Sequence, residues 1–232
     1  MFGLLRNHQL VYRSRQDVGG GVTAFVFDPA EGKLDAQPGQ HGMVAVSAGA
    51  RKPFSLASAP EEEHVLIATS LVSGSAFKKG MGALREGDEI GMRGPIYTYG
   101  QRFTIDDDVS RAVLLAQGVG ITPLRSILAH LDLTGRTVET SLVHVAADGH
   151  PFREDTERWT TRSTYVDHAA DFRAAASSAA ADDRERMFYV AGAPAFVSST
   201  TTLLREQGVG PSRIREDKYL FYKPGKNLAA SG

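Results

Sequence analysis

Two loops in the second half of the chain contain residue types that hold a pyrophosphate. In AQGVGITP, Gly118 and Gly120 allow a tight turn and a close approach of the backbone to a ligand. Thr122 is expected to cap the helix that follows, and Pro123 suits the first position of that helix. Free amides at a helix start attract phosphate. The same residues also fit an ordinary strand-to-helix turn, so this motif leaves both interpretations open.

The second loop, YVAGAPAFV, has the same character. Ala191 and Gly192 end an expected strand, and Pro194 begins an expected helix. The carboxyl ends of parallel strands meet at one edge of a sheet, and ligands bind there. The two loops are therefore predicted to line one cleft.

The first half contributes the stretch ARKPFSLASAP. Lys52 supplies a cation, Phe54 a planar ring, and Ser55 and Ser58 supply hydroxyl groups. A charge for phosphate and a ring for stacking suit an anionic aromatic cofactor, whereas the alternative is an ordinary edge strand. Residues 73–75 (SGS) precede an expected helix and form a second candidate anion site.

The composition narrows the class of protein. The chain has 232 residues, of which 42% are hydrophobic and 23% charged, so it can form one large or two small packed domains. A formal net charge of -1 is not that of a nucleic-acid-binding protein. The absence of cysteine excludes disulfides, thiolate metal sites and cysteine nucleophiles.

Neither a metal site nor a membrane span is expected. The histidines show no metal-ligand spacing. No stretch approaches the roughly 20 apolar residues of a membrane-spanning helix. The first residues lack the apolar region of a signal peptide. We therefore expect a cytoplasmic protein.

The elements that must position these loops differ between the two halves. Up to about residue 100, short strands alternate with turn residues, and one helix is expected from Ser75 to Leu84. Gly19, Gly20 and Gly21 are expected to form a flexible hairpin between two strands. This pattern predicts a small antiparallel β-barrel.

Beyond that point, strands and helices alternate four times. The first strand, RAVLLAQ, is a continuous apolar run, which is typical of a strand covered on both faces. The alternation predicts an α/β domain with a parallel sheet and helices on both faces. A boundary near Thr104 to Asp108 gives a barrel domain over residues 1–105 and an α/β domain over residues 106–232.

Seven motifs follow one another along the chain: PGQ, KPFSLAS, SGSAFKKG, RGP, QGVGITP, VAGAP and EDKYLFY. In this order and spacing they resemble the ferredoxin–NADP reductase family, from Leu10 to Tyr222. The two-domain form is also similar to the NAD(P)H:flavin oxidoreductases. The resemblance implies a barrel that holds FAD, a parallel-sheet domain that holds NAD(P)H, and hydride transfer from NAD(P)H to the flavin.

The resemblance also assigns residues to these cofactors. Ser55 is implied as the catalytic residue, with its hydroxyl near the flavin N5, and Phe54 is implied to lie against the flavin. The full set of implied cofactor-binding residues is Arg51, Lys52, Pro53, Phe54, Ser55, Thr69, Ser70, Ser73, Gly74, Ser75, Gly118, Gly120, Thr122, Pro123, Ala191, Gly192, Pro194, Tyr219 and Tyr222.

The sequence departs from the family pattern at several positions. Lys52 replaces the usual arginine and lacks its bidentate fork, with Arg51 beside it to share the pyrophosphate. Tyr97 and Phe221 stand where glycine is usual, and Ala191 stands where cysteine is frequent. The aromatic residues of the terminal segment are expected either to cover the flavin or to pack between the domains.

The choice of nicotinamide cofactor and of electron acceptor stays open. Ala146, Ala147 and Asp148 favour NADH slightly, whereas Arg153 or Arg162 could reach the 2′-phosphate of NADPH. The acceptor is expected to be a ferredoxin, a flavodoxin or an oxygenase component. The alternatives are a small acceptor, such as free flavin or a ferric complex, and a non-catalytic redox-sensing or regulatory subunit.

Overall fold

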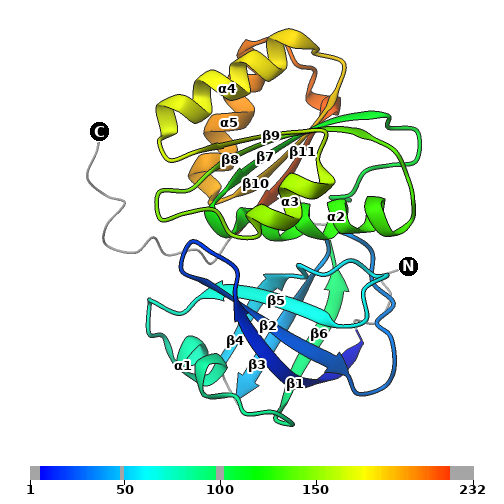
Figure 1. The fold of residues 1–232 in the computed structure, drawn as a ribbon, viewed down its shortest axis with the longest axis vertical. Coiled ribbons are helices and arrows are strands. Elements are labelled where there is room, and N and C mark those ends of the chain that lie inside the picture. Colours follow the sequence, from blue (N-terminus) through cyan, green and yellow to red (C-terminus); the bar gives the residue numbers. More distant parts are fainter. Residues whose placement is uncertain (1–5, 48–49, 98–101, 220–232) are drawn as a thin grey trace.

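The computed structural model describes residues 6–47, 50–97 and 102–219. Two units lie one above the other, and the first is built on a six-stranded sheet (Figure 1). Its strands follow the order β4-β3-β6-β1-β2-β5, and the recorded pairings are antiparallel. The strands are β1 Asn7–Asp17, β2 Val22–Pro29, β3 His41–Ser47, β4 Ala50–Ser55, β5 Val65–Ser70 and β6 Glu89–Ile96.

This sheet curls until its two edges touch. Leu56, just after β4, forms an isolated antiparallel bridge with Ile67 of β5, and the N–H of Ala57 donates to the Leu66 carbonyl at 2.8 Å. Large apolar side chains that point inward along the strands form one core, as period-two alternation requires. The helix α1 (Ala76–Ala83) packs its buried residues into that core. The predicted antiparallel barrel is confirmed as this curled sheet.

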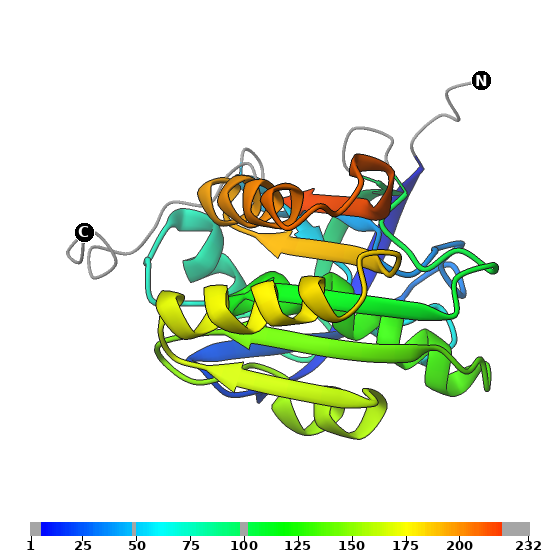
Figure 2. The same ribbon diagram turned by 90° about the horizontal axis from the view of Figure 1, so that it is seen from above.

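The second unit is a five-stranded parallel sheet in the order β11-β10-β7-β8-β9. The helices α4 and α5 cover its outer face, and α2 and α3 cover the face toward the barrel (Figures 1 and 2). The predicted α/β unit is therefore confirmed. The elements are β7 Arg111–Gln117, α2 Ile121–Leu133, β8 Glu139–Val145, α3 Arg153–Trp159, β9 Arg162–Val166, α4 Ala169–Asp182, β10 Met187–Gly192, α5 Pro194–Glu206 and β11 Ile214–Lys218.

One hydrophobic cluster is shared by the two units. Val22 and Leu66 of the barrel belong to the same buried cluster as Ile121 and Leu124 of α2. Burial of apolar surface stabilises a junction by roughly 25 cal/mol per Å². A continuous apolar junction therefore fixes how the two units sit relative to one another.

Arg125 of α2 adds hydrogen bonds and ion pairs to this junction. Its guanidinium is buried and donates to both carboxylate oxygens of Glu62, at 2.6 and 3.0 Å, and to the Ala57 carbonyl at 2.9 Å. Its Nε donates to Asp155 at 2.9 Å, and the guanidinium lies 5.1 Å from the ring centre of Trp159. Arg125 thus ties the loop after β4, α2 and α3 into one body.

The triple-glycine hairpin between β1 and β2 does not behave as an unattached loop. A Cβ built on Gly20 would lie 2.4 Å from the Gly149 carbonyl oxygen, so the hairpin packs tightly against the loop after β8. The N–H of Phe152 donates to the Val18 carbonyl at 2.8 Å. The hairpin between β1 and β2 is therefore confirmed, its flexibility stays a prediction, and Gly20 is needed for close packing between the units.

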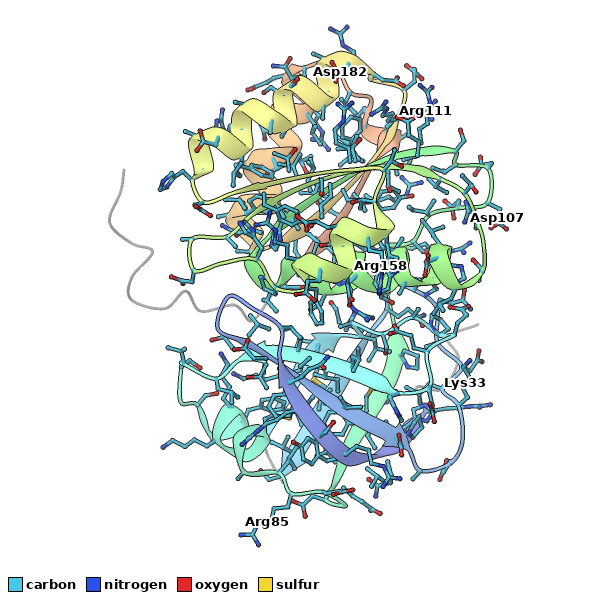
Figure 3. All side chains as sticks on the ribbon, viewed as in Figure 1. Lys33, Arg85, Asp107, Arg111, Arg158 and Asp182 are labelled. Atoms are coloured by element: carbon cyan, nitrogen blue, oxygen red, sulfur yellow. The ribbon has the colours of Figure 1, made fainter. Side chains whose placement is uncertain are left out.

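The connection between the units runs from the end of β6 at Ile96 to the start of β7 at Arg111. The expected boundary after residue 105 falls inside that connection and stays a prediction. Exposed Arg85 and Asp182 project from opposite ends of the molecule, whereas Arg158 lies near the junction (Figure 3).

Candidate functional site

The two glycine loops predicted to share a cleft do meet at one edge of the parallel sheet. A Cβ built on Gly120 would lie 2.4 Å from the carbonyl oxygen of Ala191 and 3.0 Å from the Cα of Gly192. Only a residue without a side chain allows the end of β10 to come this close. Pro194 then begins α5, as the sequence indicates.

The start of α2 differs from the prediction in one detail. Residues 118–120 form a short 3-10 turn, and α2 begins at Ile121 with Gly120 as its N-cap, so Thr122 is not the cap. Thr122 instead donates its hydroxyl hydrogen to the Val119 carbonyl at 3.0 Å and lies 2.9 Å from the Tyr219 hydroxyl. The 3-10 turn lets α2 begin at Ile121, before the expected cap Thr122. Pro123 is therefore the third residue of the helix and not its first.

Gly118 needs glycine for a different reason. Its φ is +52°, the left-handed region, and nothing lies within 4 Å of a Cβ built there. Its carbonyl oxygen lies 2.9 Å from Nε2 of His144, a fully buried residue of β8. Burial lowers the pKa of His144 from 6.5 to about 4, the Gly118 carbonyl opposes that shift, and nearby His150 adds to it. Sequence reasoning missed His144, because no spacing rule marks a residue that acts from beneath a loop.

The barrel carries a cationic site at the start of α1. Lys52 of β4 donates from Nζ to the Ser75 hydroxyl at 3.3 Å, and Ser75 caps α1 by accepting from the Lys78 N–H at 3.4 Å. Burial, and then the charge of Lys52, lower the pKa of Lys78. Gly74 has a φ of +57° in the loop before the cap. Two amines and free helix-start amides at one place suit an anion.

Phe54 takes a position that the motif alone does not specify. Its ring stacks on Phe77 of α1, with ring centres 5.1 Å apart and planes inclined by 22°. Ser58, close behind it in the sequence, is buried and accepts from the Leu66 N–H at 3.0 Å, which is a structural role.

The other barrel residues of the predicted set take varied positions. Arg51 and Ser73 are exposed, and Pro53 and Ser70 are half-buried. Thr69 is buried near the end of β5.

Ser55, at the end of β4, makes a further polar contact between the two units. Its hydroxyl donates to Oδ2 of Asp217 on β11 at 3.4 Å, and both residues are buried. Asp217 was not among the predicted site residues, although the acidic pair in EDKYLFY was the available signal.

Tyr219 completes this group. Its N–H donates to the Gly192 carbonyl at 3.0 Å, and its hydroxyl donates to the Val119 carbonyl at 3.1 Å. Burial raises the pKa of Tyr219, the Asp217 carboxylate raises it further, and hydrogen bonding with Thr122 and Ser55 opposes the shift. Tyr219 therefore stays protonated and links both glycine loops. The predicted residue Tyr222 lies outside the described residues.

The two arginines considered for a 2′-phosphate are not equivalent. Arg162 begins β9 and pairs with Ser141 of β8, which puts it at the end of the sheet away from the loops. Arg153 donates to Glu157 at 2.9 Å and stacks over Tyr165, with 4.6 Å from guanidinium carbon to ring centre. Only Arg153 is on the side where a dinucleotide would lie.

No group of three or more histidine, aspartate or glutamate side chains that could hold a metal ion occurs within 6–47, 50–97 and 102–219. In the same residues, no helix is long and apolar enough to cross a membrane.

Flavohemoproteins, an electron transfer subunit and a reductase component are among the proteins to which this chain is similar. No protein-family model matches the chain. The flavohemoprotein of Deinococcus radiodurans is 31% identical over 149 residues, which cover 60% of this chain and 36% of that protein. The vanillate O-demethylase oxidoreductase of a Pseudomonas species is 23% identical over 234 residues, which cover 96% of this chain and 71% of that protein.

Solved structures share the fold. A ferredoxin NADP+ reductase from Neisseria gonorrhoeae with bound FAD and NADP has a TM-score of 0.70 at 16% identity, over 93% of this chain and 99% of that chain. The chain spans about a third to three fifths of the length of the flavohemoproteins that it matches first.

Proposed function

The chain matches the ferredoxin–NADP reductase-like flavoproteins in its fold and in its relatives, and from this premise we propose that it is an FAD-dependent NAD(P)H oxidoreductase. FAD would be held by the barrel and NAD(P)H by the glycine loops of the parallel sheet. Together they supply hydride transfer from the nicotinamide to the flavin N5, whereas the protein supplies binding and orientation.

The barrel has the donor set that an FAD pyrophosphate requires. Lys52, Lys78 and the capped start of α1 gather positive charge and N–H donors around Ser75. Burial, and then the charge of Lys52, lower the pKa of Lys78, so an anion beside the two amines would favour their charged forms. An anion placed there would relieve the repulsion between the two amines.

The parallel sheet has a matching loop for the second pyrophosphate. Gly118 presents an open surface at the start of α2, and Gly120 lets the end of β10 approach within contact distance. Helix-start amides at the carboxyl edge of a parallel sheet are a common binding site for dinucleotide phosphates.

The observation that carries the proposal is the meeting of Ser55 and Asp217 across the two units, at 3.4 Å. It brings the end of the barrel strand beside the glycine loops, where the flavin and nicotinamide rings would have to face one another. In that arrangement the Ser55 hydroxyl donates its one hydrogen to Asp217, which orients its oxygen, and Tyr219 excludes water from the same place.

The cofactor preference that we propose is NADH. Asp148 follows β8 at the edge where an adenosine ribose would lie, and its charge repels a 2′-phosphate. Arg162 lies at the other end of the sheet, and Arg153 is engaged by Glu157 and Tyr165.

We further propose that the electrons pass to a carrier protein or an oxygenase component in the cytoplasm. The vanillate O-demethylase oxidoreductase and the reductase component of a propane 2-monooxygenase are among the relatives, which supports this choice. Reduction of free flavin or ferric complexes is the alternative, and turnover assays with added carriers distinguish the two.

The test is anaerobic reduction of the FAD-loaded protein. The purified protein is saturated with FAD, desalted and mixed with NADH or NADPH, while the flavin absorbance is followed. We expect rapid bleaching, faster with NADH. A bound flavin that stays oxidised would favour a non-catalytic sensing subunit, and failure to bind FAD at saturation would reject the proposal altogether.

A further inference from the structure

A buried imidazole lies directly behind the loop that follows β7. His144 is fully buried on β8 and pairs with Ala116 of β7 in the sheet. Its Nε2 lies 2.9 Å from the Gly118 carbonyl oxygen. Because a carbonyl can only accept a hydrogen bond, Nε2 carries the proton and donates.

Gly118 is the part of this loop that most needs to be held. With a φ of +52° and open space where a Cβ would be, it has no side chain to fix its conformation. Glycine has the widest choice of backbone conformations, so the peptide after it can rotate unless something restrains it. The restraints on its carbonyl oxygen are the N–H of Ile121 and Nε2 of His144.

Holding this carbonyl also directs an amide. The Gly118 carbonyl and the Val119 N–H belong to one planar peptide unit and point in opposite directions. With the carbonyl turned toward the buried His144, the Val119 N–H points away from the sheet interior. Outward-facing amides at a helix start are donors for phosphate oxygens.

The rest of the imidazole is held by packing alone. Its ring centre lies 5.0 Å from that of His150 and 6.1 Å from that of Tyr165. Nδ1 of His144 is buried and has no hydrogen-bond partner among the described residues. A buried nitrogen without a partner is unfavourable, so an apolar ring would stabilise this position better if packing were its only role.

We propose that His144 is a positioning residue for the dinucleotide, which holds the Gly118 carbonyl so that the loop amides stay directed at the pyrophosphate. The inference rests on the proposed function and extends it to a residue that does not line the cleft. His144 acts through the backbone of the loop and touches neither cofactor.

Two substitutions separate the hydrogen bond from the packing. His144→Phe keeps an aromatic ring against His150 and Tyr165 but has no donor. His144→Gln places an amide nitrogen near the position of Nε2 and keeps the donor. The readout is the Kd of NAD+ and of NADP+ for the oxidised, FAD-loaded protein, measured by calorimetry without turnover.

For His144→Phe we expect the Kd to rise about tenfold, which corresponds to the loss of about one hydrogen bond. For His144→Gln we expect a Kd within about twofold of wild type. The FAD content and the rate of flavin reduction at saturating NAD(P)H should not change in either variant, because the loop acts only on dinucleotide binding. A residue that merely supports the fold would lower FAD content and dinucleotide affinity together.

These measurements separate a failure of the His144 inference from a failure of the proposed function. If wild type binds NAD+ and is reduced, and His144→Phe binds equally well, the inference is overturned and the proposed function stands. If wild type neither binds a dinucleotide nor is reduced, both fall. If His144→Phe does not fold, His144→Asn replaces it, because its shorter amide cannot reach Gly118. A wild-type Kd for His144→Asn then overturns the inference.

Discussion

The hydroxyl of Ser55 lies 3.4 Å from Oδ2 of Asp217, although the two residues are 162 positions apart and belong to different sheets. Both residues are buried, with Ser55 7% and Asp217 4% exposed. A hydrogen bond to a buried carboxylate is stronger than one to a neutral acceptor, so Asp217 fixes the direction in which the Ser55 hydroxyl points.

The first prediction concerns this pair. Ser55→Ala should slow flavin reduction by about tenfold or more without lowering FAD content, because a single orienting hydrogen bond is removed near the reacting atoms. Asp217→Asn should slow it less, since an acceptor remains but the charge is lost. In the double variant the two effects should not multiply, because Asp217 acts through Ser55. Stopped-flow reduction of the four proteins measures this, and fully multiplicative losses would contradict the coupling.

A second prediction tests the packing of the glycine hairpin. Gly20→Ala puts a Cβ 2.4 Å from a backbone oxygen of the other unit at a φ of +59°, so it should lower the free energy of unfolding by more than about 2 kcal/mol. Gly21→Ala is the matched control, with a φ of +63° and open space, and should cost about 1 kcal/mol. Urea unfolding of both variants gives the comparison. Equal losses would mean that the hairpin is not packed against residue 149.

The third prediction concerns the ion pairs of Arg125 at the junction. Arg125→Met removes the donors to Glu62 and Asp155 and leaves their carboxylates partly buried, which should cost about 3–5 kcal/mol of unfolding free energy. Arg158→Met is the control, because exposed Arg158 also approaches Asp155, at 3.6 Å, and Trp159, at 5.2 Å. It should cost less than about 1 kcal/mol. If chemical unfolding showed the two variants to be equally stable, the ion pairs of Arg125 would not stabilise the junction.

The fourth prediction is a pH dependence of stability due to His144. Its pKa is about 4 in the folded protein against 6.5 as a free side chain, mainly because burial disfavours the charged form. Between these values the unfolded chain binds a proton that the folded protein does not. The contribution of neutral His144 to the free energy of unfolding is therefore complete above pH 6.5. It is lost as the pH falls toward 4, by about 3 kcal/mol at most.

His144→Gln isolates this contribution, since glutamine does not titrate. The stability advantage of wild type over the variant should shrink as the pH is lowered from 7 to 4, as measured by urea unfolding at each pH. His150, Asp167 and Arg153 lie around the same cluster and stay unchanged in both proteins, so their own titration largely cancels. An advantage that is constant with pH would show that the imidazole is not buried in its neutral form.

The sequence alone determined the order of the strands and helices and the places of the two glycine loops. Period-two strands before residue 100 and apolar runs after it predicted a barrel and a parallel sheet, because the spacing of buried side chains depends only on local geometry. Gly118, Gly120 and Gly192 were identified from their places next to expected helix starts, but the contact that requires glycine at 120, the approach of Ala191, comes from the fold.

The tertiary structure decided everything that depends on contact between distant segments. Asp217 reaches Ser55, Gly20 packs on Gly149, and His144 supports Gly118 only because the two sheets and the loops are folded onto one another. No periodicity in the chain records these pairs. They follow from how a shared apolar core fixes one unit against the other, and burial then sets the charge states of His144 and Tyr219.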